Sequence, residues 1–97
     1  MEQDLESLTV RRKRLRYRCT HCGMKEMDLI LGGFASAHLD ALLEAEIAEF
    51  EVLVEVPDDL LFLWFSGRET VPERYAGGIY RRIAAHAARG GAARCRP

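Results

Sequence analysis

Long apolar runs are missing from this 97-residue sequence. Its longest apolar stretch falls far short of the ~20 residues that a membrane-spanning helix needs, so no membrane insertion is expected. The first ten residues are acidic and then apolar, and a basic segment follows them. A secretory signal has the opposite order, with its basic region first. The sequence therefore predicts a cytoplasmic protein.

Cysteine is scarce, with three residues in the chain. An odd number fits a reducing compartment better than a disulfide framework. Two of them, Cys19 and Cys22, enclose His21 in the segment CTHCG. A zinc knuckle of this kind needs a second pair of ligands, which the chain does not offer. The other candidate ligands are His38, His86 and Cys95.

The position of the two cysteines also matters for redox chemistry. We expect Cys19 and Cys22 in the last turn of a helix, where the helix dipole disfavours a thiolate, whereas redox pairs sit at helix N-termini. Two ordinary reduced thiols are therefore the favoured interpretation. A small zinc or redox module built from Cys19, His21 and Cys22 is retained as an alternative.

The residue sets that usually carry catalysis are not recognisable either. There is no Ser/His/Asp set, no glycine-rich phosphate loop and no pair of carboxylates in a pocket pattern. The sequence predicts a protein that is not an enzyme.

Positive charge is absent from residues 26–67, which contain ten Asp and Glu. Residues 11–18, RRKRLRYR, carry six basic groups, and the C-terminal third is basic again. Such segregation suggests a charged partner, or one end of the fold lying on the other. One tyrosine and no recognisable motif make nucleic acid the weaker explanation of the basic segment. A nucleic-acid-binding helical domain stays as a second alternative.

Two helices are predicted in the first half of the chain. Residues 9–21 form the first, with Thr9 as its N-cap. Residues 24–37 form the second, because apolar residues recur along one helical face: Met24, Met27, Leu31 and Phe34. Gly32 and Gly33 weaken this helix by ~1 kcal/mol each, and they mark either its end or a close helix crossing.

A third helix is predicted from Asp40, its N-cap, to Val54. The segment EFEVLVEV alternates polar and apolar residues, so a strand over residues 50–56 is the alternative. A short fourth helix over residues 60–65 follows Pro57 and contains Trp64, which we expect in the core.

The remaining end signals lie around this fourth helix and a fifth one. Asp58 or Asp59 is the expected cap of the fourth helix, and Gly67 its stop. Residues 68–88 contain the fifth helix, with Thr70 as its cap.

The sequence thus predicts an all-α fold, a compact single-domain bundle of about five short helices. The helical domain spans residues 9–89, between a flexible N-terminus at residues 1–8 and a disordered C-terminal tail at residues 90–97. Short loops favour antiparallel neighbours.

The order of these segments resembles the SdhE family, the succinate dehydrogenase assembly factors also called flavinators. The resemblance covers about residues 11–88. The family signature, Arg-Gly-x-x-Glu with a frequent Asp two residues on, follows a segment Arg-Lys-Arg-Leu-x-aromatic-Arg. Here RKRLRYR precedes CGMKEMD. The matching positions are Arg14, Leu15, Tyr17, Gly23, Glu26, Asp28 and Trp64. Cys22 replaces the signature arginine, so its charge is missing unless Lys25 or His21 supplies it.

The resemblance implies that the chain binds the flavoprotein subunit of succinate dehydrogenase, or of fumarate reductase, and promotes covalent FAD attachment to it. The flavoprotein itself is thought to catalyse the attachment. No nucleic acid, no metal and no stably bound cofactor are implied for this chain. Gly23 would allow close approach, and Glu26 would meet a basic side chain of the partner or favour the helix dipole. The implied partner-binding residues are Arg14, Tyr17, Cys22, Gly23, Met24, Lys25, Glu26 and Asp28.

Overall fold

The computed structural model describes residues 7–89, in which every regular element is helical. The all-α prediction is confirmed. The predicted C-terminal tail and most of the predicted flexible N-terminus lie outside the described residues. The elements are α1 (Leu8–Thr20), α2 (Lys25–His38), η2 (Leu39–Ala41), α3 (Glu44–Leu53), α4 (Asp58–Phe65), η3 (Glu73–Tyr75) and α5 (Gly78–Ala88), where η marks a 3-10 helix.

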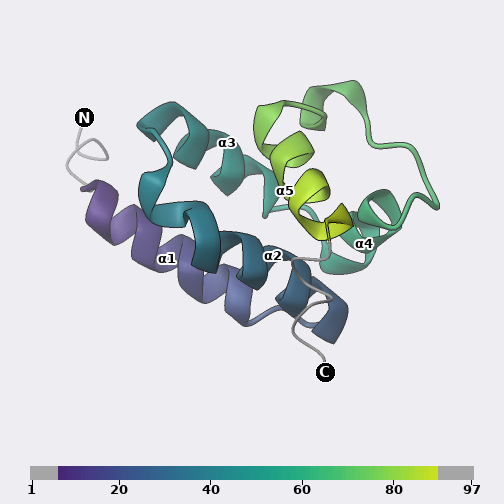
Figure 1. Ribbon diagram of the computed structural model, residues 1–97, viewed down its shortest axis with the longest axis horizontal. Coiled ribbons are helices and arrows are strands. Elements are labelled where there is room, and N and C mark those ends of the chain that lie inside the picture. The colour runs from purple at the N-terminus through teal and green to yellow at the C-terminus, as the bar shows by residue number, and fades with distance from the viewer. Residues whose placement is uncertain (1–6, 90–97) are drawn as a thin grey trace.

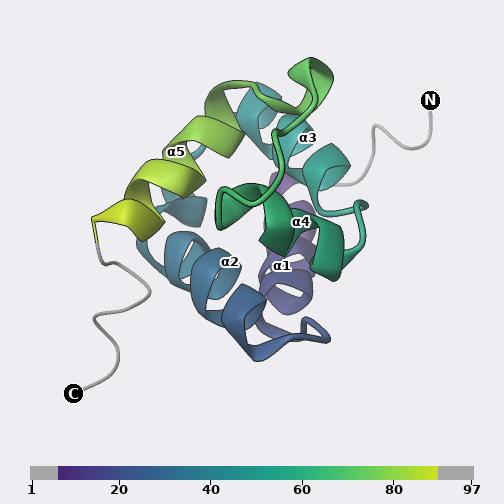
Figure 2. The same ribbon diagram turned by 90° about the vertical axis from the view of Figure 1, so that its right-hand side faces the viewer.

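The five α-helices enclose one core. Helices α1 and α2 run antiparallel along one side of the molecule, and α3, α4 and α5 cover the other side (Figure 1). Helix α2 contacts α1, α4 and α5, whereas α3 contacts α1 and α5. Figure 2 shows the helices grouped around this common centre. Within residues 7–89, no helix combines the length and apolarity needed to cross a membrane.

The core is made of apolar side chains from all five helices. Phe34 of α2 and Phe50 of α3 meet edge to face at its centre, with ring centroids 5.9 Å apart. Trp64 of α4 is buried and lies against Tyr75 of η3, so the core position predicted for this tryptophan is confirmed. No polar or charged residue among those described is buried.

Helices α1 and α2 cross closely at Gly32. A Cβ atom at this position would lie 3.4 Å from the carbonyl oxygen of Cys19, at the limit of van der Waals contact. The predicted close helix crossing is therefore confirmed at Gly32, whereas Gly33 faces the side chain of His86. The alternative, that Gly32 and Gly33 end the helix, is wrong because α2 continues to His38. Packing of Leu31, Phe34 and Ala35 into the core keeps this helix intact through its two glycines.

The predicted caps of the first and third helices are wrong. The hydroxyl of Ser7, not Thr9, accepts the backbone N–H of Val10 at 3.2 Å. Asp40 lies in η2, and the backbone then becomes extended at Leu42 and Leu43 before α3 begins. The Glu46 carboxylate accepts the N–H of Leu43 at 2.8 Å. The strand alternative is also wrong, since α3 extends to Leu53.

Helices α4 and α5 also begin elsewhere than expected. Helix α4 starts at Asp58, and Gly67, with φ +82°, follows its end as predicted. Neither Asp58 nor Asp59 is its N-cap, a position held by Pro57. Helix α5 starts only at Gly78, not at Thr70. The extended backbone of Gly77 separates it from η3, so residues 68–88 do not form one helix.

Candidate partner-binding site

The basic segment 11–18 lies in α1, and the acidic middle of the chain folds against it. Arg11 forms ion pairs with Glu51 at 2.9 Å and Glu44 at 3.4 Å. Arg16 pairs with Asp40 at 3.1 Å. The segregated charges of the sequence thus meet within the fold, which was one of the two predicted explanations. The nucleic-acid alternative is weakened, because these guanidinium groups already pair with carboxylates of the same chain.

Arg12 binds backbone oxygen atoms instead of a carboxylate. Its Nη2 donates to the carbonyl of Leu42 at 2.8 Å, and its Nε donates to that of Leu39 at 3.3 Å. These carbonyls belong to η2 and the connection that follows it. Arg12 therefore binds backbone acceptors along η2 and just after it, and it joins α1 to this part of the chain.

The signature residues lie around the α1–α2 loop, residues 21–24. Two carboxylates from different helices hold consecutive amides of this loop. Asp28 Oδ1 accepts the N–H of Cys22 at 2.7 Å, and Asp58 Oδ2 accepts the N–H of Gly23 at 2.8 Å. Hydrogen bonds to charged acceptors are the stronger kind, so the loop backbone is firmly placed.

Arg18 is a residue of this site that the sequence reasoning missed. Its Nη2 donates to Asp58 Oδ1 at 2.7 Å and to the carbonyl of Val54 at 2.8 Å. The only sequence signal for it is its place at the end of the RKRLRYR segment. Its partners lie 36 and 40 residues away in the chain, so no local pattern points to them.

The pKa values of this pair show that the charges support each other. Burial alone raises the pKa of Asp58, but the hydrogen bond from Gly23 and the Arg18 guanidinium outweigh it and lower the pKa. Burial likewise lowers the pKa of Arg18, and the hydrogen bond and charge of Asp58 outweigh that effect and raise it. Both groups are therefore charged at neutral pH.

Two charged side chains at the start of α2 face solvent. Lys25 and Glu26 are exposed, and within residues 7–89 neither forms a hydrogen bond or ion pair. The carboxylate of Glu26 in the first turn of α2 is also favoured by the helix dipole. These two groups are therefore available to a partner without any internal contact having to break.

Tyr17, near the end of α1, and His21, at the start of the α1–α2 loop, form a stacked pair. Their ring centroids are 3.8 Å apart, and Tyr17 is 63% exposed. Nδ1 of His21 lies 2.8 Å from the carbonyl oxygen of Tyr17. A carbonyl can only accept, so Nδ1 donates in this contact. The stack extends the exposed surface from the loop along the outer face of α1.

The other predicted site residues have different surroundings. Arg14 is exposed one helical turn before Tyr17, on the same face of α1. Met24 is half-buried against the core, and Asp28 is half-buried and bound to the loop backbone. Their direct contact with a partner remains a prediction. Of these residues, Asp28 has an observed role in anchoring the loop.

The two thiols are poorly suited to redox chemistry. Cys19 is fully buried in α1, and Cys22 is half-buried beyond its end, not in the last turn as predicted. Burial, together with the charge of Cys22, raises the pKa of Cys19 to about 12. Burial and the carboxylates of Asp58 and Asp28 raise the pKa of Cys22 to about 11. Thiolates, the reactive form, are therefore rare at neutral pH.

The other proposed zinc ligands do not join them. His38 and His86 pack against the ring of Phe34, with centroids 4.9 and 5.9 Å from it. Cys95 lies outside the described residues. Across residues 7–89, no three His, Cys, Asp or Glu side chains gather in a way that would hold a metal ion.

We expect slow alkylation of both thiols by iodoacetamide at pH 7 in a Cys95→Ser variant. Well below a thiol pKa the thiolate fraction rises about tenfold per pH unit, so the rate at Cys22 should climb steadily from pH 7 to pH 9. The same protein in urea is the control, with thiol pKa values near 8.5. Rapid labelling of the folded protein at pH 7, read by mass spectrometry, would show that a thiol is activated.

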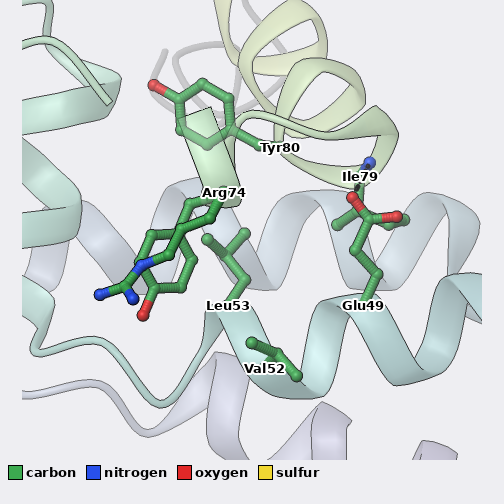
Figure 3. A pocket seen from close by; sticks show the side chains of 7 residues that line it. Glu49, Val52, Leu53, Arg74, Ile79 and Tyr80 are labelled. Atoms are coloured by element: carbon green, nitrogen blue, oxygen red, sulfur yellow. Dashed lines mark hydrogen bonds between the residues drawn. The ribbon is translucent and has the colours of Figure 1, made fainter. Parts of the chain in front are cut away.

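A shallow pocket between α3, η3 and α5 is a second place where a ligand could be sought (Figure 3). Its volume is about 160 Å³, below the roughly 300–1,000 Å³ of usual ligand sites. Tyr75 and Tyr80 line it, and the Glu49 carboxylate points at the start of α5, where it accepts the N–H of Ile79 at 3.2 Å. The Glu49 carboxylate in the wall of this pocket is therefore already bound to the backbone at the start of α5.

Gly77→Ala is expected to destabilise the protein by about 1 kcal/mol, the usual net worth of one hydrogen bond. A Cβ atom at Gly77 would overlap the Glu49 carboxylate and displace it from Ile79. Gly78→Ala is the matched control, because a Cβ there meets nothing within 4 Å. Urea unfolding measures both. Equal stability of the two variants would show that the Glu49 contact contributes nothing.

Comparison with known protein families gives a match over residues 13–87 to the family described as the flavinator of succinate dehydrogenase. This match includes most of α1, the whole α1–α2 loop and every later helix except the last residue of α5. The chain belongs to the flavinator family. The resemblance inferred from the RKRLRYR and CGMKEMD segments is thereby confirmed.

Individual relatives of this chain carry the same kind of name. The FAD assembly factor SdhE of Acetobacter pasteurianus is 37% identical over 78 residues, which are 80% of this chain and 72% of the relative. The mitochondrial succinate dehydrogenase assembly factor 2 of Dictyostelium discoideum is 28% identical over 89% of this chain and 61% of its own length. The mitochondrial succinate dehydrogenase assembly factor 2 of Danio rerio is 30% identical over 76% of this chain and 48% of its own length. The chain spans only part of these mitochondrial relatives.

Proposed function

We propose that this flavinator binds the flavoprotein subunit of succinate dehydrogenase and promotes the covalent attachment of FAD to it. The single observation that carries this proposal is the α1–α2 loop. Its backbone is fixed by Asp28 and Asp58, while Lys25 and Glu26 beside it are exposed and uncommitted. A fixed backbone with free charges fits recognition of a protein surface.

The chemistry of binding follows from these groups. Glu26 offers a carboxylate to an arginine or lysine of the flavoprotein, and Lys25 offers an ammonium to an acidic group. The Tyr17–His21 stack adds a flat, partly apolar surface next to them. Because the loop is already ordered, little conformational entropy is lost on binding. Arg14, on the same face of α1, extends the proposed contact area.

The proposed role in FAD attachment is conformational, not catalytic. The flavinator binds one conformer of the flavoprotein better than others, and it shifts the equilibrium only by that difference in affinity. FAD stays with the flavoprotein, which performs the covalent step. We propose that the chain acts in the cytoplasm. We also propose the flavoprotein subunit of fumarate reductase as a second binding partner.

Complex formation tests the proposal directly. Purified flavinator and the FAD-free flavoprotein subunit from the same organism should form a one-to-one complex in size-exclusion chromatography. Rising salt should weaken it, since exposed charges lie at the proposed interface. An unrelated flavoprotein that never attaches its FAD covalently is the control and should not bind. Equal binding of both flavoproteins, or of neither, would contradict the proposal.

Cys22→Arg is expected to be tolerated and to raise the affinity for the flavoprotein several-fold. The thiol of Cys22 lies close to the carboxylates of Asp28 and Asp58, and to the single guanidinium of Arg18. The guanidinium of an arginine at position 22 would therefore be stabilised by the negative charges of Asp28 and Asp58. Isothermal titration with the flavoprotein subunit gives the affinity, and Cys22→Gln, uncharged and of intermediate size, is the control. Loss of binding in Cys22→Arg alone would show that a cation is excluded there.

A further inference from the structure

Asp58 connects three separate parts of the chain. It is the first residue of α4, and its side chain is 18% exposed. One carboxylate oxygen accepts the N–H of Gly23 in the α1–α2 loop at 2.8 Å. The other accepts Nη2 of Arg18, near the end of α1, at 2.7 Å. A single carboxylate thus fastens the loop and the helix that precedes it to α4.

Arg18 is fixed in turn by the backbone. Its Nη2 and Nε donate to the carbonyl of Val54, at 2.8 and 3.1 Å. Val54 directly follows α3. The guanidinium therefore cannot swing away from Asp58 without breaking two further hydrogen bonds, and Asp58 is held in the orientation in which it meets Gly23.

The loop depends on this contact because glycine is the most flexible residue. Gly23 has no side chain to pack, and Met24, the N-cap of α2, makes no capping hydrogen bond with its side chain. Among the described residues, the Asp58 carboxylate is the hydrogen-bond partner of the Gly23 amide. Lys25 and Glu26 are only two and three residues further along the chain. The backbone conformation of Gly23 therefore affects where their Cα atoms, and so their side chains, lie.

We propose that Asp58 is a positioning residue of the partner-binding loop, which holds Gly23 so that Lys25 and Glu26 meet the flavoprotein in a fixed geometry. This inference rests on the proposed function. It assigns to α4 a part in recognition although Asp58 itself is mostly covered. It also explains why the Asp58 side chain binds Gly23 and Arg18 instead of an N–H group of its own helix. In α4 it is the neighbouring Asp59 whose carboxylate accepts a backbone N–H, that of Leu60.

The plain alternative is that Asp58 is only one of several ion pairs that stabilise the fold. The chain contains a matched pair for comparison. Arg11 and Glu51 join α1 to α3 through two hydrogen bonds, of 2.9 and 3.2 Å, and both side chains are partly buried. The hydrogen bonds of the Glu51 carboxylate go to Arg11 and not to the α1–α2 loop. Removing Glu51 therefore disturbs a similar contact without touching the proposed site.

The experiment compares Asp58→Ala with Glu51→Ala in the full chain. We measure urea unfolding, affinity for the flavoprotein subunit where both variants are folded, and amide hydrogen exchange of Gly23 by NMR. Both variants should lose stability. Only Asp58→Ala should bind at least tenfold more weakly and show faster exchange at Gly23. Asp58→Asn keeps an oxygen acceptor for Gly23, so it should recover part of the affinity, and it replaces Asp58→Ala if that variant does not fold.

Two results would overturn this inference by itself. One is equal affinity of the Asp58 and Glu51 variants for the flavoprotein. The other is unchanged exchange of the Gly23 amide in a variant that binds weakly. Failure of the unaltered chain to bind the flavoprotein is a different outcome, which overturns the proposed function and this inference together.

Discussion

Glu26→Ala is expected to abolish or greatly slow covalent FAD attachment while the variant chain itself stays folded. Glu26 is exposed and makes no internal hydrogen bond or ion pair within residues 7–89. Most surface changes of this kind alter stability by no more than about 0.5 kcal/mol. At a desolvated interface, losing one member of a charge pair costs about 2–5 kcal/mol, or a factor of tens to thousands in affinity.

The measurement is covalent flavin fluorescence of the flavoprotein subunit in a denaturing gel. The strain lacks its native factor and carries each variant at equal expression. Glu69→Ala is the matched control, because Glu69 is equally exposed but lies beyond α4, outside the proposed site. Full attachment with Glu26→Ala would place the interface elsewhere. Loss of FAD attachment with both variants would mean that removing any exposed carboxylate of the chain has this effect, whether or not it lies in the proposed site.

Gly23→Val is the second substitution for which a large effect is expected. Its φ angle is not positive, and an added Cβ would meet only the Asp58 carboxylate, at an ordinary 3.8 Å. The variant should therefore fold with an unchanged helical content. The valine side chain would project from an exposed part of the loop and keep the flavoprotein at a distance. We expect a ten- to hundredfold loss of affinity, the scale of one lost central contact.

Gly78→Val supplies the control for added bulk. Gly78 is exposed, and nothing lies within 4 Å of a Cβ atom placed there. Circular dichroism of both variants checks the fold, and isothermal titration gives the affinity. If Gly23→Val binds as well as Gly78→Val, the backbone of Gly23 is not approached closely by the partner.

The helices that the sequence predicted best are those with a regular apolar face. The ends of α1 and α2 were predicted to within about one residue, because Met27, Leu31 and Phe34 repeat along the core face of α2. The helix caps, and the starts of α3 and α5, were predicted poorly. Capping depends on which polar side chain reaches a free N–H after folding, so Ser7 and Glu46 serve where Thr9 and Asp40 were expected.

The residues of the candidate site were chosen by resemblance to the SdhE family and not by periodicity. The sequence named Lys25 and Glu26 as candidate partner-binding residues, and the structure shows that both are exposed. It could not distinguish them from Asp28, which is turned inward to the loop backbone. It also missed the contact between Arg18 and Asp58, because a hydrogen bond across 40 residues leaves no local pattern.

The central claim is that this chain makes the flavoprotein subunit competent to bind FAD covalently. The most direct measurement is the rate of covalent flavin attachment in a mixture of purified FAD-free flavoprotein subunit and FAD, with and without the purified chain. The account predicts a clear acceleration that saturates near one chain per flavoprotein and is lost with Glu26→Ala. An identical rate with and without the chain, in a mixture where the flavoprotein does attach FAD, would contradict it.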